Sequence, residues 1–310
     1  MVGSCHKFYS LGGDYPPDCE CAMITNKFNL PEALYRAILN DPYKKVSDFT
    51  ASELPVPVQI RALRNRYSDE IKQDATELIF PLIGNNVHHI IERVDLKNAL
   101  QEERFQTTIQ GFTLSGQIDL YEHPILWDFK VTTRFVLIDG AKPDWIAQSN
   151  VNAWLMKTYK FNVEQIKIGA IFRDWSKIQA LRDKDYPQRQ VAVLPMPLWK
   201  EEDTYEWIKE RITEHIAADI TPDEKLPECT PEERWEKPTT YAVKKGKNKR
   251  AVRVLPSLED AEDYIIKNIS ETIGSNRQYW IEERPGQSTR CEYYCEVKDF
   301  CQQYKRMKEA

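Results

Sequence analysis

A short apolar segment that carries two charged residues constrains the fold of this chain more than any other feature. Residues 125–131 read ILWDFKV, so Asp128 and Lys130 stand in a run that otherwise belongs in a protein core. Successive side chains of a strand point to opposite faces, so both charges share one face, while Trp127 and Phe129 share the other. A charge in such a strand is costly unless it is paired or bound to a metal ion.

The segments just before this strand favour antiparallel neighbours. Residues 104–114 alternate in polarity and are expected to form one strand, and residues 116–121 (GQIDLY) a second. His123-Pro124 supplies the turn into the apolar strand. Short turns between strands demand antiparallel pairing. A tight hairpin would therefore bring the carboxylate of Asp119 next to the two charges of the apolar strand.

Helical periodicity surrounds these strands. The expected helices cover residues 30–40, 52–66 after an initial turn, 69–94 with an interruption at Pro81, 145–159, 198–217 and 258–273. Two further strands are expected at 166–172 and 191–194, and a hairpin at 241–254. Helices alternating with strands predict an α/β fold with a central mixed sheet flanked by helices. We find no internal repeat.

Composition excludes several classes of protein. Hydrophobic residues make up 41% of the 310 residues, which excludes a disordered chain. The 48 acidic residues exceed the 43 Lys and Arg, and the net charge of −5 excludes a wholly basic DNA coat but not a local basic groove. We expect neither a membrane span nor a secretory signal, because no apolar run approaches roughly 18 residues and residues 1–10 lack an apolar stretch.

Asp119, Asp128 and Lys130 together have a chemical use. Two carboxylates can hold Mg²⁺ or Mn²⁺ through oxygen and leave positions open for water and a phosphate. The ammonium group of the lysine can orient that water or stabilise charge on the phosphate. The alternative is a buried Asp–Lys ion pair that fixes the hairpin and does no chemistry.

Two helical positions belong to the same hypothesis. His88 lies at the flank of an apolar helix face, and Gly84 one turn earlier on the same side would let a backbone or a phosphate approach closely. Gln148 and Asn152 share one face of a later helix. A glutamine at the edge of a metal site can hold a water or a phosphate oxygen. Each of these residues could equally be an ordinary structural residue.

The seven cysteines are unevenly spaced. Cys291, Cys295 and Cys301 fall within eleven residues, whereas Cys229 stands apart. A chain of this size without a secretory signal has no need of a disulfide framework, so such a triplet suggests metal or cluster binding. Thiolates suit iron–sulfur clusters or zinc.

A run of basic residues follows the polar connector at 222–238. Lys244, Lys245, Lys247, Lys249, Arg250 and Arg253 lie in and beside the turn of the expected hairpin. This segment is either a solvated turn or a clamp on a DNA backbone, which would give salt-dependent binding without sequence preference.

Taken together, these motifs resemble the PD-(D/E)xK nuclease superfamily, and within it the RecB-like branch of CRISPR-associated and phage-encoded iron–sulfur exonucleases. The pattern of that branch is G-x-x-x-H, G-x-x-D, (D/E)-x-K and Q-x-x-x-Y. This chain has GNNVH, GQID, DFK and QSNVN in the same order, with Asn152 where the family often has tyrosine. The resemblance runs from about Ser52 to Phe172 and resumes at the cysteine-rich tail.

The resemblance implies a fold and a division of the chain. The fold would be α/β, a restriction-endonuclease-like core with a central mixed β-sheet flanked by helices, plus a C-terminal Cys-rich subdomain. Residues 1–50 would form an N-terminal arm and helix, residues 51–228 the nuclease core, and residues 229–310 a hairpin–helix insert and Cys-cluster tail packed on the core.

The resemblance also implies roles for single residues. His88, Asp119 and Asp128 would be ligands of Mg²⁺ or Mn²⁺, Lys130 the catalytic lysine, and Gln148 a residue that positions substrate or water. Asn152 could still hydrogen-bond a DNA phosphate. The ligands of a 4Fe-4S cluster, or alternatively of Zn²⁺, would be Cys229, Cys291, Cys295 and Cys301, with Cys5, Cys19 and Cys21 as other choices for the remote ligand.

The function implied is a metal-dependent DNA nuclease, an exonuclease on single strands or DNA ends. Two alternatives stay open: a catalytically degenerate nucleic-acid-binding or scaffold subunit of a recombination or repair complex, and a site-specific endonuclease. DNA is the expected partner and a membrane is not. The expected location is the cytoplasm of a prokaryote or of a phage-infected cell.

Overall fold

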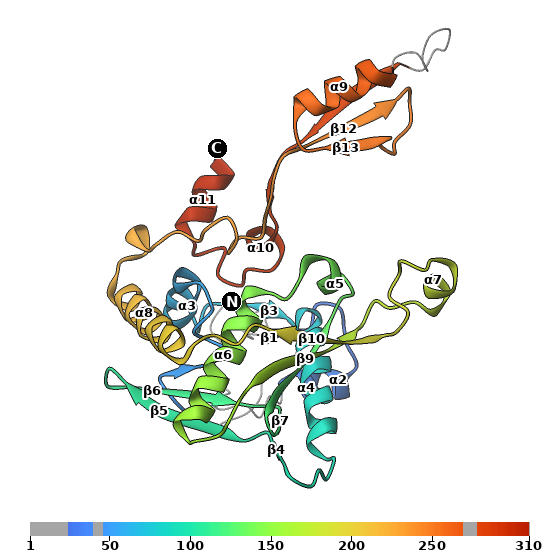
Figure 1. Ribbon diagram of the computed structural model, residues 1–310. Helices are drawn as coiled ribbons and strands as arrows, with labels where there is room; N and C mark the ends of the chain where they lie inside the picture. Colours follow the sequence, from blue (N-terminus) through green and yellow to red (C-terminus); the bar gives the residue numbers. More distant parts are fainter. Residues whose placement is uncertain (1–23, 40–45, 269–277, 310) are drawn as a thin grey trace. The chain divides into compact units, whose positions relative to one another are not determined.

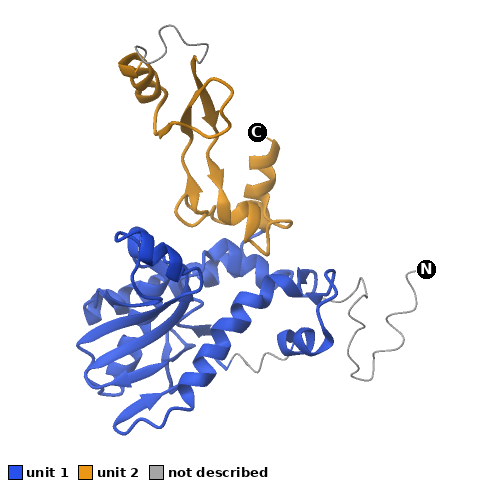
Figure 2. Cartoon of the chain, turned by 90° about the vertical axis from the view of Figure 1, so that its right-hand side faces the viewer, with its two compact units in different colours: residues 1–222 blue, residues 223–310 orange. Residues whose placement is uncertain are grey.

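A computed structural model of the chain describes residues 24–39, 46–268 and 278–309 (Figure 1). The chain divides into two compact units, Met1–Pro222 and Asp223–Ala310, which are coloured differently in Figure 2. The residues predicted to bind a divalent ion all belong to the first unit. The four cysteines predicted as cluster ligands all belong to the second.

The first unit contains a five-stranded mixed sheet. Its strand order is β10 (Val191–Met196), β9 (Gln165–Phe172), β8 (Ile125–Thr132), β7 (Leu120–Glu122) and β4 (Ala99–Gln101). The pair β8–β9 is parallel and the other neighbours are antiparallel. A parallel pair needs a crossover, and helix α6 (Pro143–Thr158) lies in that connection. The α/β fold with a central mixed sheet flanked by helices is therefore confirmed.

A second, three-stranded sheet corrects one prediction. Its order is β2 (Phe49–Thr50), β6 (Phe112–Gln117) and β5 (Arg104–Ile109). The single strand expected at 104–114 is wrong, because the chain reverses at Gln110 and Gly111, where φ is 53° and 85°. Positive φ at both central residues is the geometry of a tight two-residue hairpin. GQIDLY is likewise not one strand, since Asp119 lies between β6 and β7, which belong to different sheets.

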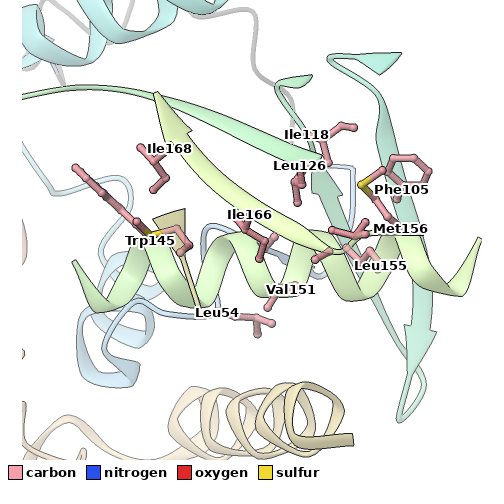
Figure 3. Close-up of a cluster of buried hydrophobic side chains, with 14 of the residues drawn as sticks. Leu54, Phe105, Ile118, Leu126, Trp145, Val151, Leu155, Met156, Ile166 and Ile168 are labelled. Atoms are coloured by element: carbon pink, nitrogen blue, oxygen red, sulfur yellow. The ribbon is translucent and has the colours of Figure 1, made fainter. Parts of the chain in front are cut away.

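Helix α6 fills the centre of the hydrophobic core of this unit. Figure 3 shows Val151 and Leu155 of this helix among the same buried side chains as Ile166 and Ile168 of β9. Helix α8 (Glu201–Ile220) packs against α6 and α3 (Val58–Arg66), and it contributes fully buried isoleucines to the same core. Helix α6 is buried along most of its length and contacts both sheets as well as α8.

Helix α4 (Ile79–Glu92) carries the predicted histidine. It follows a short 3₁₀ helix, η1 (Ala75–Leu78), whose first turn is capped by the Asp74 side chain. The interruption expected at Pro81 is wrong, because this proline is the third residue of α4. A first-turn proline loses no intrahelical hydrogen bond, since the first amides of a helix have no partner within it.

The remaining elements of the first unit are short. They are β1 (Ile24–Thr25), which pairs in parallel with β3 (Gln73–Asp74), and the helices α2 (Glu32–Leu39), α5 (Val136–Asp139) and α7 (Lys177–Arg182). Helix α2 packs on η1 through Tyr35 and Ile38, which form a small apolar cluster with Ala75. This cluster supports the start of α4.

The second unit contains the expected hairpin within a three-stranded antiparallel sheet. Its strands are β13 (Arg253–Leu255), β12 (Thr240–Lys245) and β14 (Tyr279–Arg284), in that order. Helix α9 (Leu258–Asn268) lies along this sheet (Figure 1). The end of the helix expected at 258–273 lies outside the described residues. The other elements are η2 (Asp223–Lys225), β11 (Glu236–Lys237), β15 (Gln287–Ser288), α10 (Thr289–Tyr293) and α11 (Gln302–Glu309).

We also compared the described helices with the requirements of a membrane span. None of them combines the length and the apolar character that crossing a bilayer needs.

Candidate functional site

Asp119 lies beside the middle of β8. In the antiparallel ladder of β7 and β8, Leu120 pairs with Trp127, so the next step along the ladder sets Asp119 opposite Asp128. The Asp119 Oδ2 atom accepts a hydrogen bond of 2.6 Å from the backbone amide of Phe129. The strand pairing thus brings the two carboxylates of the sequence motif to one end of the ladder.

Asp128 and Lys130 share the face of β8 that is turned toward α6. Asp128 is 5% exposed, and its Oδ1 atom accepts a 3.0 Å hydrogen bond from the ammonium of Lys130. The same ammonium lies 3.4 Å from Oε1 of Gln148 on α6. Gln148 therefore belongs to the same group of side chains, because it contacts the ammonium that pairs with Asp128.

The electrostatics of this pair differ from those of exposed groups. Burial raises the pKa of Asp128 to about 6, and the charge of Asp119 adds to the rise, while the ammonium of Lys130 opposes it. Burial alone would lower the pKa of Lys130, but the charges of Asp128 and Asp119 outweigh it and raise the pKa above the ordinary lysine value. Lys130 consequently stays protonated at neutral pH.

His88 on α4 reaches the same carboxylates. Its Nδ1 atom lies 3.4 Å from Asp119 Oδ2 and 3.8 Å from Glu102 Oε1. The hydrogen bond with Asp119 raises the pKa of His88, although partial burial opposes the rise. The neighbouring His89 is exposed and lies 3.4 Å from Glu92 on the same helix, so it has no part in the group.

Glu102 is a member of the group that sequence reasoning missed. It follows the last residue of β4, and its Oε2 atom accepts a 2.8 Å hydrogen bond from Gln117. Burial raises the pKa of Glu102, and the charge of Asp119 raises it further. One ligand atom from each of His88, Glu102 and Asp119 can be chosen so that all three lie within 4.8 Å of one another. No motif marks Glu102, because Glu103 beside it has the same chemistry in the sequence.

Two carboxylate oxygens at this site make no hydrogen bond. They are Asp128 Oδ2 and Glu102 Oε1, and both are buried. A buried carboxylate oxygen without a donor is unfavourable, so a cation at either oxygen would stabilise it. The ligand atoms within 4.8 Å of one another belong to His88, Glu102 and Asp119, and Asp128 is outside that group. Carboxylate oxygens with one imidazole suit hard divalent ions such as Mg²⁺ and Mn²⁺. The residues present therefore fit the divalent ion that the sequence motifs imply.

Asn152, the residue expected to contact a DNA phosphate, is not available on the surface. It is 4% exposed, and its amide donates a 3.1 Å hydrogen bond to the backbone oxygen of Gln117. A Cβ atom on Gly116 would come within 2.1 Å of Asn152 Oδ1, so the asparagine packs directly on β6. We therefore leave Asn152 out of the DNA-contacting residues. Around Gly84, in contrast, no atom lies within 4 Å of the Cβ position.

The four cysteines of the second unit lie near one another. Burial raises the pKa of the Cys229 thiol above its ordinary range. The charge of Glu233 and the other three thiols raise this pKa further, by smaller amounts. Burial also raises the pKa of Cys295 to about 11, with contributions from Cys291 and Cys301. Among the described residues, however, no three of these sulfur atoms lie within 4.8 Å of one another. Thiolates as a class suit an iron–sulfur cluster or zinc. Cys5, Cys19 and Cys21, the other choices for the remote ligand, lie outside the described residues.

The Cys229 segment is held by the last helix. Gln303 on α11 accepts a 2.9 Å hydrogen bond from the Cys229 amide and donates one of 3.0 Å to its carbonyl oxygen. Arg234 donates a further bond of 2.7 Å to the same carbonyl. These contacts keep Cys229 beside the triplet, although it is distant in sequence.

The basic residues of the hairpin divide into two groups. The ammonium of Lys244 forms an ion pair with Glu282, and those of Lys244 and Lys245 each lie 4.9 Å from the ring centroid of an aromatic residue of β14. Lys247, Lys249 and Arg250 are exposed in the turn between β12 and β13, and Arg253 is exposed at the start of β13.

We compared the chain with known proteins. No family model and no curated protein sequence matches it. Among solved structures, it is similar to SSO0001, with 17% identity over 59% of this chain and 84% of that one and a TM-score of 0.41. It is also similar to a phage-related exonuclease from Haemophilus somnus 129PT, with 16% identity over 52% of this chain and 77% of that one and a TM-score of 0.30.

Proposed function

We propose that this chain is a divalent-metal-dependent nuclease that hydrolyses phosphodiester bonds of DNA, as an exonuclease on single strands or DNA ends. The observation that carries the proposal is that Asp119 is hydrogen-bonded to the backbone amide next to Asp128, whose carboxylate pairs with the ammonium of Lys130. Carboxylates that can hold a cation, next to a fixed positive charge, are what hydrolysis of a phosphodiester requires. The resemblance of the four motifs to RecB-like nucleases points to the same reaction.

The residues that would hold the ion are Asp119 and Asp128, with His88 and Glu102 beside them. A bound Mg²⁺ or Mn²⁺ lowers the pKa of a water molecule and polarises a phosphate oxygen. The ammonium of Lys130, held by Asp128 and Gln148, stabilises the charge that develops on the phosphate. The water oxygen would bond to phosphorus while the bond to the 3′ oxygen breaks. One water proton would end on the 3′ oxygen and the other on the phosphate or in solvent, which gives a 5′-phosphate and a 3′-hydroxyl.

The test is digestion of end-labelled linear DNA with Mn²⁺ or Mg²⁺. Asp128→Ala and Lys130→Ala should abolish cleavage while the proteins stay folded by circular dichroism. The chain offers a matched control, because Asp95 and Lys97 have the same D-x-K spacing on an exposed segment. Asp95→Ala and Lys97→Ala should leave cleavage unchanged. Full activity in both Asp128→Ala and Lys130→Ala would refute the assignment of the site.

The same assay separates the alternatives. Binding of DNA in EDTA without cleavage in Mn²⁺ would favour a scaffold subunit with a degenerate site. Cleavage of closed circular DNA would favour an endonuclease, since an exonuclease needs an end. The size of the released products separates these two activities as well. Mononucleotides would favour an exonuclease, and longer fragments an endonuclease.

We propose separately that Cys229, Cys291, Cys295 and Cys301 hold a structural 4Fe-4S cluster. The side chains would bind as thiolates, the form of cysteine that ligates iron and zinc. Protein purified without oxygen should be brown, and Cys291→Ala should lose the colour. Colourless protein with one equivalent of zinc would support the alternative metal.

A further inference from the structure

The sheet of the second unit has one face that no helix covers among the described residues. Helix α9 packs on the opposite face, where the ring of Tyr264 lies 6.5 Å from that of Tyr279. Alternation along β14 then turns Trp280 away from the helix. Lys244 of β12 pairs with Trp280 across the strands and shares this face, which we call the open face.

Trp280 is held in a fixed position on the open face. Its indole nitrogen donates a 2.9 Å hydrogen bond to the carbonyl oxygen of Gly246, at the start of the turn between β12 and β13. The ammonium of Lys244 lies 4.9 Å from the centroid of its ring. Even so, 43% of Trp280 is exposed. A large ring that is oriented by two contacts and still exposed is ready to stack on a planar ligand.

The turn beside this ring is strongly positive. Residues 240–255 contain six Lys and Arg residues and no Asp or Glu, in a chain whose net charge is −5. Lys247, Lys249 and Arg250 in that turn are exposed. Helix α9 on the other face has four acidic residues and one lysine. The sheet is therefore positive at its hairpin turn and negative on its helix side. On the open face Glu282 forms an ion pair with Lys244, so the charge that attracts a polyanion beside Trp280 comes from the turn.

We propose that the open face binds single-stranded nucleic acid, with a base stacked on Trp280 and phosphates beside Lys247, Lys249 and Arg250. Proteins that bind single strands without sequence preference combine aromatic platforms with positive surfaces in this way. A duplex hides the faces of its bases, so it would use the positive charges but gain nothing from the ring. The inference does not depend on the metal site and adds a binding surface to the proposed nuclease.

The test uses the full chain in EDTA, with fluorescence anisotropy of labelled oligothymidylate as the readout of binding. Trp280→Ala should weaken binding roughly tenfold, because base stacking on one ring has about that value. Trp280→Phe should retain most of the affinity, since it keeps a ring. The melting temperature of each variant checks that the sheet is intact. If the Ala variant unfolds, Trp280→Leu, which keeps an apolar side chain without a ring, takes its place and should show the same loss.

The contribution of the basic residues to binding is measured by the salt dependence of the affinity. Each phosphate contact on a single strand contributes about 0.7 to the slope of log affinity against log salt. Replacing Lys247, Lys249 and Arg250 together by alanine should therefore lower the slope by about 2. The control replaces three exposed basic residues of the α7 region, Lys177, Arg182 and Lys184, by alanine and should leave the slope unchanged.

Three results would overturn the inference. The first is that the unmodified chain does not bind the oligonucleotide. The second is that Trp280→Ala and the unmodified chain bind it with equal affinity. The third is that Trp280→Ala loses as much affinity for duplex DNA as for single-stranded DNA. Because the assay contains no divalent ion, loss of cleavage in Asp128→Ala does not affect it. Failure of the proposed nuclease reaction and failure of this surface can thus be told apart.

Discussion

The backbone amide of Phe129 donates a 2.6 Å hydrogen bond to the carboxylate of Asp119. The β7–β8 ladder ends at the Leu120–Trp127 pair, so this amide is satisfied by a side chain rather than by a strand. Bonds to an ionised acceptor are stronger than neutral ones. The contact ends the ladder and fixes Asp119 against the centre of the D-x-K motif.

In the absence of metal, the protein should become less stable as pH rises, because the buried Asp128 side chain then has to ionise. Its pKa in the folded chain is about 6, above the ordinary value of about 3.9, so the folded state binds more protons between these values. The free energy of unfolding therefore falls from about pH 4 to about pH 6, by at most about 1.4 kcal/mol per pH unit from this one group. Urea titrations in EDTA across this window measure the slope.

Asp128→Asn removes that titration. The fall of stability between pH 4 and pH 6 should be smaller in this variant, although the raised pKa of Glu102 keeps a part of it in the same direction. Parallel slopes for the two proteins would show that Asp128 is ionised over the whole window.

Glu102→Gln should weaken the binding of Mn²⁺ in the absence of DNA. The substitution keeps the shape of the side chain but removes one negative charge from the group formed with His88 and Asp119. We expect a loss of roughly tenfold or more, measured by isothermal titration calorimetry. Glu103→Gln is the matched control, because Glu103 is exposed and adjacent. Equal affinities for both variants would remove Glu102 from the ligands.

Lys130→Met should destabilise the protein at neutral pH by about 3 kcal/mol, because it leaves the buried carboxylate of Asp128 without its ammonium partner. The double variant Asp128→Asn, Lys130→Met should recover most of this loss, since neither charge remains. Denaturant titrations of the single and double variants give the coupling. If the two changes add without coupling, the pair does not stabilise this face of β8.

Gly84→Ala and Gly116→Ala should change stability in opposite directions. The Cβ position of Gly84 on α4 is open, and alanine is the better helix former by up to about 1 kcal/mol. A Cβ on Gly116 would meet Asn152 and also Leu155 Cδ1 at 2.9 Å, so its cost should be about 1–3 kcal/mol. Thermal unfolding checks both. A stabilised Gly84→Ala variant that loses cleavage would support close approach of a phosphate there.

The strand pattern predicts a large part of this arrangement. Side-chain direction in a strand follows from spacing alone, so the shared face of Asp128 and Lys130 could be read from ILWDFKV. The turn at His123-Pro124 sets the pairing of β7 with β8, and that pairing brings Asp119 to Asp128. Their roles in catalysis stay a prediction, as does the three-part division of the chain.

Other features depend on contacts that spacing does not reveal. The reversal at Gln110 and Gly111 shifts the alternation by one position, because Ile109 and Phe112 pair across the turn and share a face. A shift of one position does not stand out in a segment of eleven residues. Glu102 differs from Glu103 only through the backbone at the end of β4, where φ of Glu102 is 52°. Asn152 shares a helix face with Gln148, yet β6 covers it and leaves Gln148 half-buried. Each outcome is decided by a tertiary neighbour.

The two hydrogen bonds between Gln303 and Cys229 join positions 74 residues apart, near the two ends of the second unit. The pairing of β11 with β15 joins the same two stretches of chain a second time. A tryptic nick after Lys247, Lys249 or Arg250 would therefore sever the polypeptide without separating it. Both fragments should elute together from a sizing column under native conditions and come apart only in denaturant.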